Sequence, residues 1–104
     1  MKIKHEKYDL DLSAEDGYFY DYMTSKGYFP NAAVSFMGKK YLLNIYDNVR
    51  LRQDLESEFT GEKSLFFEKN ILILNQLTLE NIKVAIEKII ETDGFKSFVS
   101  EIDN

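Results

Sequence analysis

The chain has 104 residues, of which 44% are hydrophobic and 14% aromatic, and it carries no cysteine and a net charge of −5. This length and composition are sufficient for one domain with a buried core, which excludes an intrinsically disordered chain. The lack of cysteine excludes disulfides and thiolate catalysis, and the acidic balance disfavours binding to nucleic acid or to anionic lipid.

No segment approaches the roughly 18 consecutive apolar residues of a membrane span, and the charged N-terminus has no apolar run behind it. We therefore expect a soluble, unprocessed protein of the cytoplasm that binds no membrane.

The first predicted element is a strand over residues 8–12, where Tyr8, Leu10 and Leu12 alternate with charged residues. A period of two is typical of a strand with one face in water. The flanking charges discourage association between sheet edges, so we expect an edge strand.

A helix is predicted next, because Ser13 is a suitable cap and Gly27 a suitable terminator. Residues 28–31 follow as a predicted loop, since Pro30 disfavours the helical conformation at Phe29.

Two extended runs, residues 32–37 and 40–46, predict a β-hairpin around a two-residue turn. The turn is assigned to Gly38 and Lys39, with glycine at the first position.

Asp47 is placed to cap a second helix, whose exposed side has pairs such as Arg50 with Asp54 at the spacing of an ion pair. Three large apolar residues recur every four positions and predict a narrow buried stripe: Leu51, Leu55 and Phe59.

The run Ile71–Leu74 has apolar side chains at every position, which predicts a central strand covered on both faces. Thr78 can cap a long helix over residues 79–91. Apolar residues recur there at helical spacing and define the buried side: Leu79, Ile82, Ala85, Ile86 and Ile89.

Gly94 is expected to end this helix, and a short last helix is expected to dock on the core. Its apolar residues are Phe95, Phe98, Val99 and Ile102. The predicted fold is one α+β domain over residues 1–104, with a mainly antiparallel sheet and three to four helices packed on it.

Few residues carry a pattern that predicts catalysis. His5 lies among charged residues near a terminus, which favours an exposed side chain over a general base. The acidic residues between 9 and 16 lack the spacing and the turn glycine of a calcium loop, and no glycine-rich phosphate loop is present. We therefore expect no enzyme, no metal and no cofactor.

Carboxylates and tyrosines interleave near the N-terminus, which is the pattern of a protein-binding surface for a cationic partner. The predicted binding residues are Asp9, Asp11, Glu15, Asp16, Tyr18, Tyr20, Asp21 and Tyr22. The competing interpretation is that these tyrosines are half-buried core residues. A second acidic patch lies on the second helix, at Asp54, Glu56 and Glu58 with Glu62, and is partly neutralised by Arg50 and Arg52.

Three segments, residues 44–56, 66–74 and 77–82 (the last together with Ala85 and Ile86), resemble small immunity proteins of bacterial contact-dependent growth inhibition systems. The resemblance extends over about residues 32 to 92, in the order hairpin, helix, strand and helix. It implies a cytoplasmic protein that binds and neutralises the C-terminal domain of one cognate toxin, commonly a nuclease. Immunity families diversify where they bind, so the resemblance transfers no binding residue, and Arg50, Asp54 and Asn70 are interpreted as determinants of the fold.

A nuclease must be basic to hold its substrate, so an acidic inhibitor is suited to cover it. Two alternatives stay open. The first is a cytoplasmic adaptor or regulatory protein that binds a peptide along an open sheet edge. The second is a small hydrolase with paired carboxylates such as Asp54 and Glu58. Moderate acidity is also common in soluble proteins without such a partner.

Overall fold

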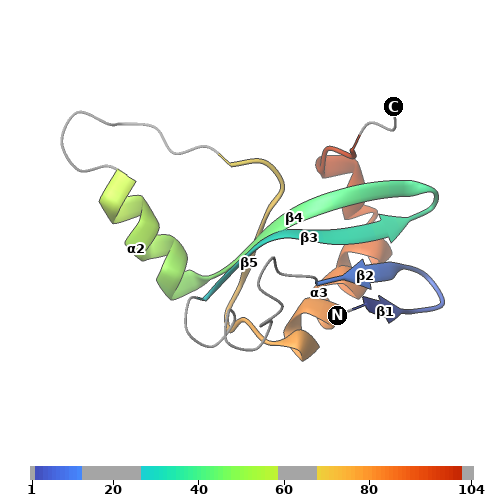
Figure 1. Cartoon of the computed structure of the whole chain (residues 1–104), viewed down its shortest axis with the longest axis horizontal. Helices are drawn as coiled ribbons and strands as arrows, with labels where there is room; N and C mark the ends of the chain where they lie inside the picture. The colour runs from blue at the N-terminus through green and yellow to red at the C-terminus, as the bar shows by residue number, and fades with distance from the viewer. Residues whose placement is uncertain (1, 13–26, 59–67, 102–104) are drawn as a thin grey trace.

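The computed structural model describes residues 2–12, 27–58 and 68–101, which form one five-stranded sheet with helices (Figure 1). The sheet order follows the chain, with β1–β2, β2–β3 and β3–β4 antiparallel and β4–β5 parallel. The elements are β1 Lys2–Lys4, β2 Asp9–Asp11, β3 Tyr28–Phe36, β4 Lys39–Asp47, α2 Asn48–Glu58, β5 Ile71–Leu74, α3 Leu79–Glu91 and the 3-10 helix η1 Gly94–Ser97.

The predicted α+β class and the mostly antiparallel sheet are confirmed. The expected three to four helices are not matched, because the described segments hold two α-helices and one 3-10 turn. The helix predicted between Ser13 and Gly27 falls on residues 13–26, outside the described residues. None of the helices in the described ranges is long and apolar enough to cross a membrane.

The alternation predicted for residues 8–12 is confirmed, since Tyr8, Leu10 and Leu12 are buried while Asp9 is exposed. The prediction of an edge strand is wrong, because β2 lies between β1 and β3. Sequence alone did not reveal β1, a strand of only three residues whose two lysines lie opposite the two aspartates of β2.

The hairpin is present, but both its start and its turn differ from the prediction. The predicted loop at 28–31 is instead the beginning of β3, with a register shift between Phe29 and Ala32. Pro30 lies at this bulge, where a strand tolerates a residue without an N–H. The turn residues are Met37 and Gly38, one position earlier than expected, with φ of 50° and 77°.

The prediction that β5 is central and covered on both faces is wrong. β5 is the last strand of the sheet, and Ile73 is 52% exposed. Leu74 belongs to the core and Leu72 packs against it, so burial accounts for two of the four apolar residues in the run Ile71–Leu74. An unbroken apolar run therefore marked one buried face and one accessible face.

Asn70 is a determinant of the fold, as predicted. Its side-chain amide donates to the carbonyls of Leu42 and Val99 at 3.1 and 2.7 Å, and its oxygen accepts from the Val99 N–H at 2.8 Å. Asn70 adopts φ of 52°, a left-handed conformation that asparagine tolerates better than most residues. It thereby joins β5 and the C-terminal segment to the same edge of β4.

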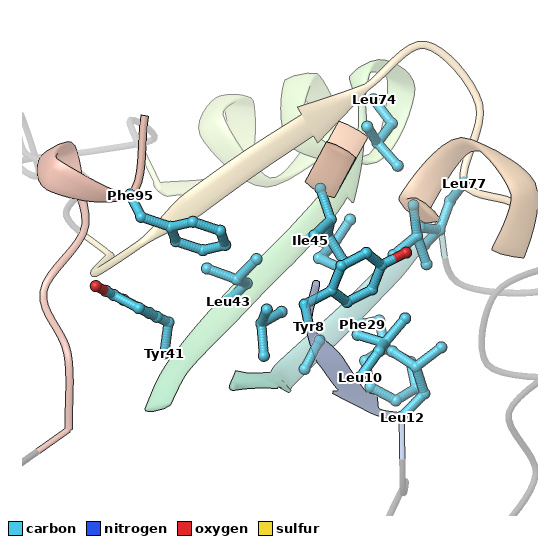
Figure 2. Packing of buried hydrophobic residues seen from close by; sticks show 14 residues of the cluster. Tyr8, Leu10, Leu12, Phe29, Tyr41, Leu43, Ile45, Leu74, Leu77 and Phe95 are labelled. Carbon is cyan, nitrogen blue, oxygen red and sulfur yellow. The ribbon is translucent and has the colours of Figure 1, made fainter. Parts of the chain in front are cut away.

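The core lies between the sheet and α3 (Figure 2). Ile82 and Ile86 of α3 are fully buried, and the Thr78 hydroxyl caps the helix by accepting from the Asn81 N–H at 3.1 Å, as predicted. The helix ends before Gly94, and Asp93 takes the left-handed φ of 59° instead. Phe95 docks on the core as expected, whereas Val99 is 58% exposed and Ile102 lies outside the described residues.

Candidate protein-binding site

Helix α2 extends beyond one end of the β3–β4 hairpin and away from α3 (Figure 1). Within residues 2–12, 27–58 and 68–101, no residue of α2 belongs to the hydrophobic core or packs against it. The predicted buried stripe is therefore wrong in part: Leu51 and Leu55 are only half-buried, and Phe59 lies outside the described residues.

Two tyrosines form the base on which α2 begins. Tyr28 of β3 and Tyr46 of β4 are cross-strand partners, and their ring centroids lie 4.4 Å apart. Successive residues of a strand alternate between faces, so Tyr46 lies on the face opposite the core residue Ile45. Its side chain is nevertheless buried.

Glu68 binds both tyrosine hydroxyls. The Tyr46 hydroxyl donates to Glu68 Oε2 at 2.7 Å, and the Tyr28 hydroxyl donates to Oε1 at 3.3 Å. Burial, followed by the hydrogen bond to Glu68, raises the pKa of Tyr46 well above its ordinary value. A hydroxyl with a raised pKa keeps its proton at neutral pH, so Tyr46 acts here as a hydrogen-bond donor that holds Glu68 in place.

The first turn of α2 is fixed to the same base. Asp47 Oδ1 accepts from the Arg50 N–H at 2.7 Å, which confirms the predicted cap. The Arg50 guanidinium lies 5.8 Å from the Tyr28 ring centroid and donates through Nε to Asp54 Oδ1 at 2.9 Å, the predicted ion pair. A Cβ at Gly27 would overlap the Asp47 carboxylate, so glycine is required beside this cap.

A continuous set of contacts thus joins Glu68, Tyr46, Tyr28, Arg50 and Asp54 across three segments of the chain. It orients a helix whose other side is accessible: Val49 is 60% exposed, and Arg52, Gln53 and Glu56 are exposed. An oriented helix with an accessible apolar residue and charged neighbours is suited to docking in a groove of another protein.

The predicted N-terminal binding residues are described only in part. Asp9 is exposed and lies across from Lys4 and Ser35, while Asp11 is half-buried and lies across from Lys2 and Ala33. The remaining predicted residues lie outside the described ones: Glu15, Asp16, Tyr18, Tyr20, Asp21 and Tyr22. The two described carboxylates therefore have lysines as strand neighbours, which weakens their negative field.

The competing acidic patch is also described in part. Asp54 is held by Arg50, Glu56 is exposed, the Glu58 side chain is not described, and Glu62 lies outside the described residues.

The free side of β5 is a second candidate. The backbone carbonyl oxygen of Asn70 accepts a hydrogen bond from the Asn44 N–H at 2.9 Å, and the parallel register pairs Asn44 with Ile71. Backbone groups alternate in direction along a strand, so the N–H and C=O of Ile71 and Ile73 point away from β4. No strand of the described segments pairs with that edge.

Sequence reasoning missed Tyr28, Tyr46 and Glu68 as a unit. A hairpin extended back to residue 28 would have paired the two tyrosines, but the proline at position 30 argued for a loop. No family model, curated protein or solved structure matches the chain, so the interpretation depends on its own residues.

Proposed function

We propose that the chain binds the C-terminal domain of a cognate bacterial toxin and neutralises it by stoichiometric occlusion, as immunity proteins do. The proposed partner is a basic protein, such as a nuclease, and the interaction requires no cofactor and no catalytic step. The observation that carries this proposal is α2, a helix held by specific contacts at its base yet excluded from the described core.

A helix of 11 residues is marginally stable alone, and most helices in proteins are stabilised by packing of an apolar face. α2 has no residue in the described core, and its Val49 is 60% exposed, so this apolar side chain is accessible to a partner. The resemblance of residues 44–56 to immunity proteins falls on this same helix and its base.

Charge supports the proposal in a second way. The net charge of −5 attracts a basic toxin domain and speeds the encounter between the two proteins. The N-terminal residues between Asp9 and Tyr22 stay part of the proposed surface, with carboxylates that set the encounter rate. α2 then supplies the apolar anchor Val49.

The proposal predicts that this gene lies directly downstream of a toxin gene, and it is tested by titrating the C-terminal domain of that toxin with the purified chain. Activity of the toxin should be lost at about a one-to-one ratio, without turnover. Complete loss of toxin activity at a small fraction of that ratio would show catalysis and exclude occlusion.

Substitutions at two valines of similar exposure test whether α2 forms the toxin-binding surface. Val49 of α2 is 60% exposed and Val84 of α3 is 54% exposed. Val49→Asp should weaken inhibition by about tenfold or more, because it places a charge in the interface. Val84→Asp is the matched control and should inhibit like the parent.

The open edge of β5 favours one alternative, an adaptor that binds an extended peptide by adding a strand. Ile73→Pro removes an N–H that points away from β4 and leaves the β4–β5 ladder intact. Toxin neutralisation that survives Ile73→Pro and fails in Val49→Asp supports the α2 surface. The reverse pattern would assign binding to the sheet edge.

A further inference from the structure

The tip of the β3–β4 hairpin has a residue that turn chemistry does not explain. Met37 is 84% exposed and takes a φ of 50°, followed by Gly38 at 77°. Positive φ at both central residues is the type I′ pattern, in which Asn-Gly is strongly preferred. A large apolar side chain at this position gains no burial and disfavours the turn, and such exceptions cluster at functional sites.

Beside the tip lies a hollow of about 470 Å³ with an aromatic wall. Phe95 is its central ring, 5.1 Å from Phe36, 4.6 Å from Tyr41 and 6.0 Å from Phe98 between centroids. Figure 2 shows Tyr41 and Phe95 facing each other, beside Leu43. Phe36 and Phe98 are half-buried, so their outer surfaces line an accessible apolar concavity, termed here the aromatic hollow.

The charge at the aromatic hollow is opposite in sign to that of the whole chain. Its lining includes two lysines, Lys39 and Lys96, and one aspartate, Asp93. Asp93 already binds Lys96, with Nζ and Oδ2 2.7 Å apart. Lys39 has no ion-pair partner within the described ranges and is exposed at the rim.

We infer that Met37 and the aromatic hollow form a docking surface for an extended segment of another protein, in which a large apolar side chain is flanked by carboxylates. The apolar side chain fills the hollow against Phe95 and Phe98, Met37 covers it from the tip, and Lys39 binds a flanking carboxylate. This partner differs from the basic toxin domain proposed above, so the two sites can be tested separately.

Because the chain has no tryptophan, a tryptophan peptide reports its own binding by fluorescence. The probe is an acetylated, amidated Glu-Glu-Trp-Leu-Glu peptide, with Lys-Lys-Trp-Leu-Lys as the charge-reversed control. The acidic peptide should show a saturable blue shift that weakens as salt is raised, and the basic peptide should bind at least about tenfold more weakly.

Met37→Asn is the decisive variant, because it creates the preferred Asn-Gly turn while removing the exposed methionine. It should bind the acidic peptide about tenfold more weakly at an unchanged or higher urea midpoint. Lys39→Glu should reverse the preference between the two peptides. Lys88→Glu, at an exposed lysine of α3, is the matched control and should leave the preference unchanged.

Three outcomes would overturn this inference: no saturable shift with the acidic peptide, equal binding of the two peptides, or unchanged binding by Met37→Asn. Sedimentation of the parent and of Met37→Asn tests whether a second copy of this chain occupies the aromatic hollow instead. A dimer of the parent that Met37→Asn dissociates would assign the aromatic hollow to a second copy of this chain and would contradict an acidic partner.

Discussion

The two α-helices of the described segments, α2 and α3, follow the same kind of cap but have different relations to the sheet. α3 buries Ile82 and Ile86 completely against it, whereas α2 contributes no residue to the described core. Thr78 and Asp47 cap the two helices by the same type of hydrogen bond, at 3.1 and 2.7 Å. A cap therefore determines where a helix begins, and the contacts of its apolar side determine whether it stabilises the domain or remains accessible to a partner.

The largest expected difference between the helices is in core truncation. Ile86→Ala should lower the free energy of unfolding by about 2–5 kcal/mol, because it leaves a cavity beneath α3. Leu55→Ala in α2 should lower it by less than about 1.5 kcal/mol. Urea unfolding followed by circular dichroism measures both, and equal losses would show that α2 is as much a part of the cooperative unit as α3.

Substitutions at Asn70 test how β5 and the C-terminal segment are joined to β4. Asn70→Ala removes three hydrogen bonds and places alanine at φ of 52°, so we expect a loss of about 2–4 kcal/mol. Asn70→Gly removes the same hydrogen bonds and relieves the backbone, so it should be about 1 kcal/mol more stable than Asn70→Ala. Identical unfolding midpoints for the two variants would remove backbone conformation from the explanation.

Two buried tyrosines, Tyr8 and Tyr46, lie on opposite sides of the sheet. The pH dependence of stability that each one causes provides a second comparison of the same two regions. Burial raises the pKa of both Tyr8 and Tyr46 above the ordinary 10.0. The folded state then keeps protons that the unfolded state releases, so stability is complete below pH 10 and falls as pH rises above it. Tyr46 should account for more of that loss than Tyr8, because its pKa is raised more strongly.

Phenylalanine substitutions separate the two tyrosines. Tyr46→Phe should reduce the alkaline loss but lower stability at neutral pH, because Glu68 loses a hydroxyl donor. Tyr8→Phe should reduce the alkaline loss at no cost at neutral pH, because the buried Tyr8 hydroxyl has no partner among the described residues. Urea midpoints at pH 7 and above pH 10 provide the measurement, and an alkaline loss unchanged in both variants would contradict the assignment.

The smallest expected effect comes from the caps. Thr78→Ala should lower the global stability by about 1 kcal/mol, because α3 belongs to the core. Asp47→Ala should leave the global transition within about 0.5 kcal/mol and instead speed hydrogen exchange at the first amides of α2. A drop of the whole transition in Asp47→Ala, equal to that of Thr78→Ala, would mean that α2 unfolds only with the domain.

Local signals predicted well and distant ones poorly. Both caps, the Arg50–Asp54 pair, the alternation in β2 and the buried side of α3 depend on residues within a few positions of one another. The position of β5 depends on which strands pair across the sheet, and an apolar run does not distinguish a covered second face from an accessible one.

The same limit applies to the candidate sites. Asp9 and Asp11 were recognised as carboxylates on a wet face, but Lys2 and Lys4 become their neighbours only through the register of β1. Tyr28 and Tyr46 pair because β3 continues through a bulge at Pro30, where the proline predicts a loop. The predicted turn at Gly38 and Lys39 lies one residue too late in the sequence, so no sequence signal singles out Met37.

The shared edge of β4 has a consequence for the order of folding. The β1–β2 and β3–β4 pairs connect across short turns, so these two hairpins can form from contacts with a low loop-closure cost, whereas β2–β3 joins residues 22 to 26 positions apart. The parallel β4–β5 ladder joins two segments that are separated in sequence by α2 and the residues after it. The Asn70–Val99 hydrogen bonds join residues that are a further 29 positions apart. The side of the molecule with β5 and the C-terminal segment should therefore form after the transition state, and substitutions at Asn70 should speed unfolding far more than they slow refolding.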